Sequence, residues 1–204
     1  IKYLIDSEYI AKPNFINVEG LKNANLSPSD LANLADGRDL TPETLKRLGA
    51  DTARNAKIID KCLEVLKKHK RVIVFATSVD QSNALAVVMA AEGYDAVSVS
   101  SKSSPQDRSR FIKSFKEDSN ERKIIFNYGI LTTGFDAPKT SAVIVARPTT
   151  SLVLYSQMVG RALRGRRAGG NKEADIYTVM DGGIKVFNDI TEAFINWEDV
   201  WNGT

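Results

Sequence analysis

Cysteine and long apolar runs are the two features that this sequence most lacks. It has one cysteine, Cys62, in 204 residues, so neither an internal disulfide nor a Cys-rich zinc site can form. No apolar stretch approaches the roughly 20 residues that span a bilayer, and the chain does not open with a signal peptide. We therefore expect a soluble, cytoplasmic protein that does not contact a membrane.

A strong net charge is also missing. The chain has 28 Lys and Arg residues against 25 Asp and Glu residues, and this balance does not by itself indicate a polyanionic partner. One stretch without acidic residues, from 161 to 172, nevertheless gathers Arg161, Arg164, Arg166, Arg167 and Lys172. Charge patterning alone leaves two interpretations open, a solvated surface loop or a site for phosphates.

What the sequence does have is an alternation of apolar runs and amphipathic segments. Apolar runs that predict strands buried on both faces occur at 72–76, 96–99, 123–127, 141–146 and 174–179. Helical patterns separate them at 81–92, 104–115 and 151–163. Right-handed crossovers would wind these units into an open, mainly parallel α/β sheet of about five or more strands, with helices on both faces.

The part of the chain before the first predicted strand divides in two. Residues 1–26 mix short apolar clusters with Pro, Asn and Gly, which is typical of an extended interdomain linker. Residues 27–70 form a predicted helical extension, with helix starts at Ser27 and Thr41 and a third helix over 52–69. In that third helix Cys62 is predicted to face the core, and His69 to lie on the surface. The main domain is predicted over 71–204.

The loop that follows the strand at 123–127 has an unusual composition. It contains Gly129, Thr132, Thr133, Gly134 and Asp136, and it lies where parallel sheets commonly carry their chemistry, at the carboxyl end of a strand. Asp136 could bind a ligand. It could also be a turn residue that accepts a hydrogen bond from its own backbone.

A polar stripe is predicted on the helix at 151–163. Gln157, Gly160, Arg161 and Arg164 follow one another at helical spacing and would lie on one face, where apolar residues normally occur. Two guanidinium groups one turn apart can bind the same phosphate through paired donors. A salt bridge to a carboxylate of this chain is the alternative, although it satisfies one arginine more readily than two.

Three stretches carry a resemblance to a known family. VIVFATSVDQSNAL (72–85), LTTGFDAP (131–138) and QMVGRALRG (157–165) resemble the fourth, fifth and sixth motifs of superfamily 2 helicases and translocases. The resemblance implies the second, C-terminal RecA-like domain of such a protein. The residues of these motifs are most similar to the DEAD/DEAH type found in helicase subunits of type I and type III restriction enzymes and in related DNA-repair helicases.

The resemblance implies roles for individual residues. Arg161 and Arg164 would be catalytic and would reach the β- and γ-phosphates of ATP, with Arg164 the stronger candidate for the arginine finger. The implied nucleotide-binding residues are Gly134, Asp136, Gln157, Gly160, Arg161 and Arg164. The residues implied to hold the nucleic-acid backbone are Thr77, Ser78, Ser100, Ser101, Thr132 and Thr133.

A complete motor also needs a GxxxxGK[ST] phosphate loop and an acidic Mg²⁺ site, and this sequence has neither. We therefore expect ATP with Mg²⁺ to be bound mainly by an N-terminal RecA-like domain of the same protein, and residues 1–204 alone to be inactive. Gln157 replaces the histidine that opens the sixth motif of RNA-type DEAD-box proteins, which favours DNA over RNA as the partner. The rival hypotheses are a non-catalytic binding module on the same frame and a nucleotide enzyme of another class, such as a small kinase.

Overall fold

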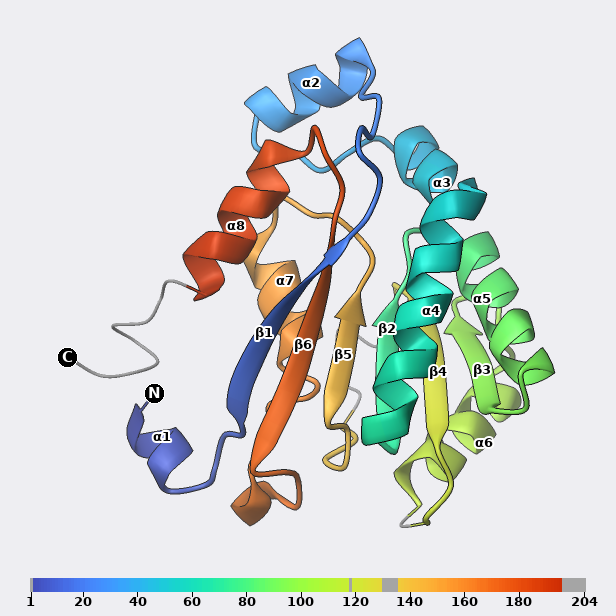
Figure 1. Cartoon of the computed structure of the whole chain (residues 1–204), viewed down its shortest axis with the longest axis vertical. Coiled ribbons are helices and arrows are strands. Elements are labelled where there is room, and N and C mark those ends of the chain that lie inside the picture. Colours follow the sequence, from blue (N-terminus) through green and yellow to red (C-terminus); the bar gives the residue numbers. More distant parts are fainter. Residues whose placement is uncertain (1, 118, 130–135, 196–204) are drawn as a thin grey trace.

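A parallel β-sheet forms the centre of the computed structural model, which describes residues 2–117, 119–129 and 136–195. Within these residues the sheet has six strands in the order β1-β6-β5-β2-β4-β3, and every pairing is parallel (Figure 1). The strands are β1 (Lys12–Glu19), β2 (Arg71–Phe75), β3 (Asp95–Ser100), β4 (Lys123–Tyr128), β5 (Ala142–Val145) and β6 (Glu173–Met180). The predicted open α/β sheet is confirmed.

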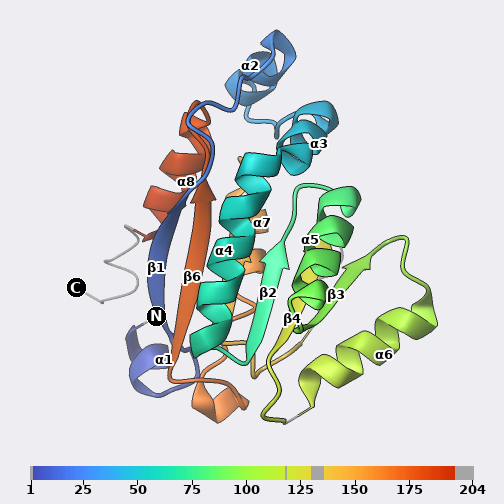
Figure 2. The same cartoon turned by 45° about the vertical axis from the view of Figure 1, so that its right-hand side comes forward.

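Helices cover both faces of this sheet (Figures 1 and 2). The helices of the described residues are α1 (Lys2–Asp6), α2 (Pro28–Ala35), α3 (Pro42–Ala50), α4 (Thr52–Lys68), α5 (Val79–Ala91), α6 (Pro105–Lys116), α7 (Leu152–Val159) and α8 (Lys185–Ile195), with a short 3₁₀ turn, η1 (Arg166–Ala168). Successive residues of one strand point to opposite faces. Accordingly, Val72 and Val74 pack with α4 and α5, whereas Ile73 and Phe75 pack with α6, α7 and α8. The two apolar clusters explain why the central strands are apolar throughout.

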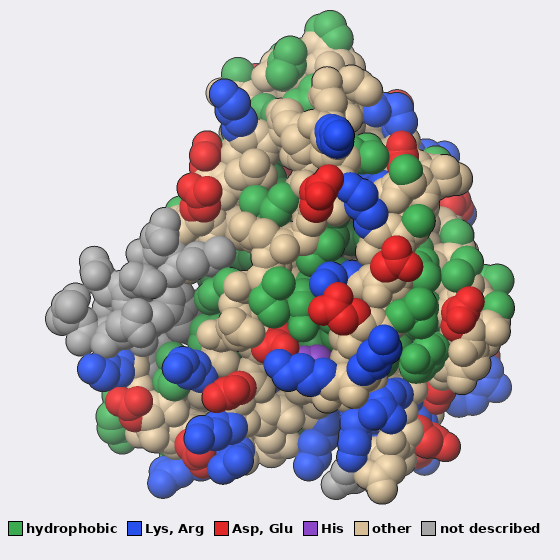
Figure 3. Space-filling model, in the orientation of Figure 1, with side chains coloured by type: hydrophobic (Ala, Val, Ile, Leu, Met, Phe, Trp, Pro, Cys, Tyr) green, Lys and Arg blue, Asp and Glu red, His purple; other side chains and the backbone are tan. Residues whose placement is uncertain are grey.

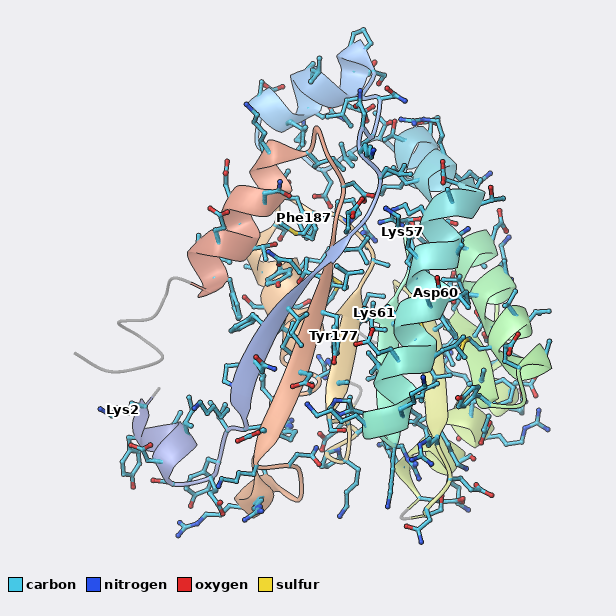
Figure 4. The ribbon with its side chains drawn as sticks, in the orientation of Figure 1. Lys2, Lys57, Asp60, Lys61, Tyr177 and Phe187 are labelled. Atoms are coloured by element: carbon cyan, nitrogen blue, oxygen red, sulfur yellow. The ribbon has the colours of Figure 1, made fainter. Side chains whose placement is uncertain are left out.

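Helix α4 is part of this layer structure. Its residues Ile58, Cys62 and Leu66 are fully buried against the sheet, which confirms the predicted core position of Cys62. Burial raises the pKa of the Cys62 thiol. On the same helix Lys61 lies over the ring of Tyr177 in β6, with 5.8 Å between Nζ and the ring centroid (Figure 4). The division of the chain into linker, helical extension and main domain stays a prediction.

The predicted helix starts are confirmed by their caps. Ser27 and Ser104 each accept a hydrogen bond from the backbone N–H three residues ahead, as does Thr41. In α2 the cap includes a buried carboxylate, Asp30, which accepts bonds from Ser27, Thr41 and Thr44. Asp30 therefore joins the starts of α2 and α3 at one point.

The N-terminal segment is not a free connector. Residues 12–19 form β1, which pairs with β6 along its whole length, from Lys12 opposite Glu173 to Glu19 opposite Met180. Without β1, the backbone groups along that side of β6 would be left unpaired. Pro13 is tolerated because β1 is an edge strand, and one side of its backbone needs no partner.

The predicted surface position of His69 is wrong. The side chain is buried, and its ring nitrogens lie 2.9 Å from Ser141 Oγ and 2.9 Å from Asp175 Oδ2. Burial lowers the pKa of His69, and the opposing effect of Asp175 is smaller. Both partners are distant in sequence, so the local helix pattern could not indicate them.

Helix α7 is shorter than predicted. It ends at Val159 with Gly160 as its C-cap, and the next three N–H groups bond three residues back, as in a 3₁₀ turn. Glycine favours such an end because it is a poor helix former. Arg161 and Arg164 thus lie beyond the helix, and the predicted four-residue helical stripe does not form.

Among the described residues, no helix is both long and apolar enough to cross a bilayer.

Candidate functional site

Arg164 and Asp136 come together on two neighbouring loops. Arg164 Nε lies 3.2 Å from Asp136 Oδ1, and the side chains are 49% and 59% exposed. A pair this open to water contributes at most about 1 kcal/mol to stability, because solvent screens it and both side chains lose freedom. The predicted alternative, a salt bridge within the chain, is therefore present for Arg164, but in a form that a ligand can displace.

Arg161 adds a second positive charge beside this pair. It is partly buried, and burial lowers its pKa, as does the charge of Arg164, whereas Asp136 opposes the shift. An arginine remains protonated in spite of such a shift. Two guanidinium groups close enough to repel each other are an arrangement that suits a phosphate group.

The other predicted nucleotide-binding residues are placed only in part. Gln157 lies half-buried in the last turn of α7, and Gly160 is exposed directly after it. Gly134, together with Thr132 and Thr133, lies outside the described residues.

The position of Asp136 and Arg164 relative to the sheet differs from the carboxyl edge that was predicted for the loop with Asp136. The strand arrows in Figure 1 point upward, so the lower edge of the sheet is its amino-terminal edge. Arg164 forms an antiparallel bridge with Ile10, just before β1, and Asn171, just before β6, donates to the carbonyl of Thr140, just before β5. Asp136, which contacts Arg164, therefore lies at the amino-terminal edge. The expectation that this acid lies at the carboxyl edge is wrong.

Basic side chains gather at this same lower end of the molecule (Figure 3). A cavity of about 260 Å³ opens there, lined by Lys68, Lys70, Arg71, Glu117, Ser119, Lys139, Ser141 and Asn171. Asn171 also donates its backbone N–H to the carbonyl of Arg164. The cavity thus borders the candidate site and adds positive charge to this edge.

At the carboxyl edge, Thr77 and Ser78 have a structural role that the sequence analysis missed. Both are buried. Thr77 donates its hydroxyl and its backbone N–H to Gln81 Oε1, and Ser78 Oγ accepts from the Gln81 N–H as the cap of α5. Contact of these hydroxyls with nucleic acid would require this cap to open.

Ser100 is the last residue of β3, and Ser101 follows it at the same edge. Ser100 is buried, and its hydroxyl accepts from the Lys102 N–H, whereas Ser101 is exposed. The sequence analysis did not single out Arg147, whose guanidinium lies 5.5 Å from the centroid of the Tyr128 ring at the ends of β5 and β4. The sequence signal that could have indicated Arg147 is its position directly after the apolar run at 141–146.

Within the described part of the chain, no three His, Cys, Asp or Glu side chains gather as a possible metal site.

Comparison with known proteins identifies the family. Residues 55–166 match the family model of the helicase conserved C-terminal domain. The chain belongs to this family, within the superfamily 2 helicases. The C-terminal domain resembles IRC3 of Saccharomyces cerevisiae, named as an ATP-dependent helicase, at 27% identity over 79% of this chain and 22% of IRC3. It also resembles a 51.5 kDa protein of a Lactococcus phage, at 30% identity over 56% of this chain and 25% of the phage protein. The chain thus spans about a quarter or less of the length of these relatives.

Solved structures share the fold of this C-terminal domain. A fragment of an HsdR subunit of a type I restriction enzyme from Vibrio vulnificus matches with a TM-score of 0.64 at 20% identity, over 91% of this chain and 35% of the fragment. The C-terminal domain of the DEAD-box protein Dbp5 matches with a TM-score of 0.59 at 18% identity, over 96% of this chain and 97% of that domain. These likenesses confirm the RecA-like fold.

Proposed function

We propose that this domain is the C-terminal motor half of an ATP-dependent nucleic-acid helicase or translocase. In this proposal Arg161 and Arg164 complete an ATP site that an N-terminal RecA-like domain of the same protein holds, together with Mg²⁺. The observation that carries the proposal is the exposed pair of Arg164 and Asp136 with Arg161 beside it.

The proposed chemistry follows from the charges. When the triphosphate arrives, Arg164 exchanges the Asp136 carboxylate for phosphate oxygens and neutralises charge that develops during phosphoryl transfer. Asp136, once released, accepts a hydrogen bond from the ribose hydroxyl. Gln157, Gly160 and Gly134 are the other proposed nucleotide-binding residues.

We infer that the partner is nucleic acid, with DNA favoured over RNA because of Gln157. The exposed Ser101 is the best placed of the predicted backbone contacts among the described residues, and Arg147 joins it as a cation at the same edge. Thr132, Thr133, Ser100, Thr77 and Ser78 remain predicted contacts. Hydroxyl and N–H donors that meet phosphate hold a strand without reading its sequence, as a motor requires.

The test uses the full-length protein and measures ATP hydrolysis with and without single-stranded DNA or RNA. Arg164→Ala should reduce stimulated hydrolysis by about a thousandfold or more, with nucleic-acid affinity largely retained. Arg110→Ala is the matched control, since Arg110 also forms an exposed pair with an aspartate, Asp107, but lies on α6.

Unchanged turnover in Arg164→Ala would contradict the proposal. Nucleic-acid binding by the wild-type protein without any ATP hydrolysis would favour the non-catalytic module instead. Residues 1–204 alone should show negligible hydrolysis, and robust turnover by this piece would also contradict the proposal.

A further inference from the structure

The loop that carries Arg164 is crossed by a short N-terminal segment, residues 8–11, which we call the strap. Ala11 donates its N–H to the Leu163 carbonyl at 3.1 Å, and Gly165 donates to the Tyr9 carbonyl at 3.0 Å. A third bond runs from the Arg167 N–H to the Glu8 carbonyl at 3.0 Å. Ile10 and Arg164 therefore face each other as a bridged pair.

Side chains of the strap reinforce this crossing. Glu8 Oε1 lies 3.4 Å from Arg166 Nη1, and the Arg167 guanidinium lies 5.4 Å from the centroid of the Tyr9 ring. Both contacts involve arginines of η1, directly after Arg164. Because the ion pair is exposed, its effect is small, and the backbone bonds carry most of the attachment.

The crossing is possible because residue 165 is glycine. A Cβ atom at Gly165 would lie 2.1 Å from the Glu8 carbonyl oxygen and 2.5 Å from the Tyr9 carbonyl carbon. On the other side of the loop, a Cβ atom at Gly170 would lie 2.0 Å from the carbonyl oxygen of Arg164. The backbone of Arg164 is thus enclosed between the strap and the turn before β6, while its side chain remains exposed.

We propose that the strap is a positioning element for Arg164, and that Gly165 allows the strap to pack against the loop that carries Arg164. This inference rests on the proposed function, in which Arg164 is the arginine finger. A shift of about 1 Å in a catalytic group can reduce turnover by about a hundredfold. Because the backbone of Arg164 is held on both sides, its guanidinium group stays in the position that catalysis needs. The strap connects α1 to β1. A movement of α1 would therefore reach Arg164 through the backbone of residues 8–11.

The experiment compares Gly165→Ala with Gly182→Ala in the full-length protein. Gly182 is the matched control, because a Cβ atom there would lie 2.0 Å from the Lys22 carbonyl oxygen, a similar clash at the opposite edge of the sheet. Hydrogen exchange at the N–H groups of Ala11 and Arg167 reports whether the strap has opened. Steady-state kinetics of nucleic-acid-stimulated ATP hydrolysis separate kcat from KM.

In Gly165→Ala both amides should exchange faster, and kcat should fall about 10- to 100-fold with the KM for ATP changed by less than about threefold. Gly182→Ala should leave exchange at these amides and kcat close to wild type. An unchanged kcat in Gly165→Ala would overturn the inference. A lower kcat without faster exchange would also overturn it, because the effect would then belong to Gly165 and not to the strap.

A charge-reversal cycle covers the case in which Gly165→Ala does not fold. Glu8→Arg and Arg166→Glu should each lower kcat about two- to threefold, and the double variant should restore it. Two single variants without effect on kcat would overturn the inference in that case.

Arg164→Ala in the same assay separates the two proposals. If Arg164→Ala is active, the proposed function itself fails, whereas an inactive Arg164→Ala beside an unaffected strap variant removes only the role of the strap.

Discussion

Arg164 and Asp136 form an ion pair, with 3.2 Å between Nε and Oδ1, that is open to solvent on both sides. Each residue lies in a stretch that resembles a different helicase motif, and in the proposed function each contacts a different part of the nucleotide. In that proposal the carboxylate is the counter-ion of the arginine until phosphate replaces it. A counter-ion with this role must be weakly held, which distinguishes it from a structural salt bridge.

The first prediction concerns the strength of this pair. Asp136→Ala and Arg164→Ala should each change the free energy of unfolding by less than about 1 kcal/mol, because solvent screens the pair. Urea unfolding followed by circular dichroism measures this change, and the double variant gives the coupling energy. A loss of several kcal/mol in either single variant would mean that the pair stabilises the fold and is not available to a ligand.

A second prediction concerns the buried ion pair of Arg54 and Asp181. Both side chains are fully buried, and Arg54 Nη2 lies 2.8 Å from Asp181 Oδ2. Arg54→Met should cost about 3–5 kcal/mol of unfolding free energy, because it leaves an uncompensated carboxylate in the core. Arg38→Met is the control, since the pair of Arg38 with Asp36 is 64% exposed on each side, and it should cost less than about 1 kcal/mol. Equal losses in the two variants would contradict the prediction.

A third prediction concerns acid stability and Asp30. Burial opposes ionisation of this carboxyl, but hydrogen bonds from Ser27, Thr44 and Thr41 outweigh it and lower the pKa of Asp30. The native state then binds fewer protons than the unfolded state. The stabilisation is therefore complete above the unfolded pKa of about 3.9 and is lost as the pH falls below it, towards the folded pKa.

Asp30→Asn should destabilise the chain by about 1–3 kcal/mol at neutral pH, because some of these donors lose their acceptor. The difference from wild type should shrink as the pH falls below about 4, because the unfolded wild-type chain then binds a proton at Asp30 that the native state does not bind. Urea unfolding at a series of pH values measures both effects. Asp36→Asn serves as the exposed control, and a difference that stays constant with pH in Asp30→Asn would count against the ionised cap.

Patterns that depend on near neighbours were predicted well. The five apolar runs became β2 to β6, and the hydroxyl caps at Ser27, Thr41 and Ser104 start helices as expected. The stretches that resemble the sixth and fifth motifs contain Arg164 and Asp136, which the structure brings together, and their roles stay predictions. These features were accessible because strand alternation, helix capping and a short motif each involve residues close in the sequence.

Features that depend on distant residues were missed. Residues 12–19 are a strand because β6 offers them an unpaired edge, although their own composition resembles a linker. His69 is buried because Asp175 in β6 and Ser141 just before β5 contact its ring. Thr77 and Ser78 are buried because they form hydrogen bonds with Gln81 in the first turn of α5. The pairing of Ile10 with Arg164 had no signal in either local sequence.

The sequence by itself determined strands β2 to β6 and the helix caps, because short-range periodicity encodes them, and motif spacing singled out Arg161 and Arg164 as candidates. Only the tertiary structure decided that Arg164 lies at the amino-terminal edge, faces Asp136 and is crossed by the strap. Those relations arise when backbone groups far apart in the chain satisfy one another's hydrogen bonds, and no local pattern records which distant partner will do so.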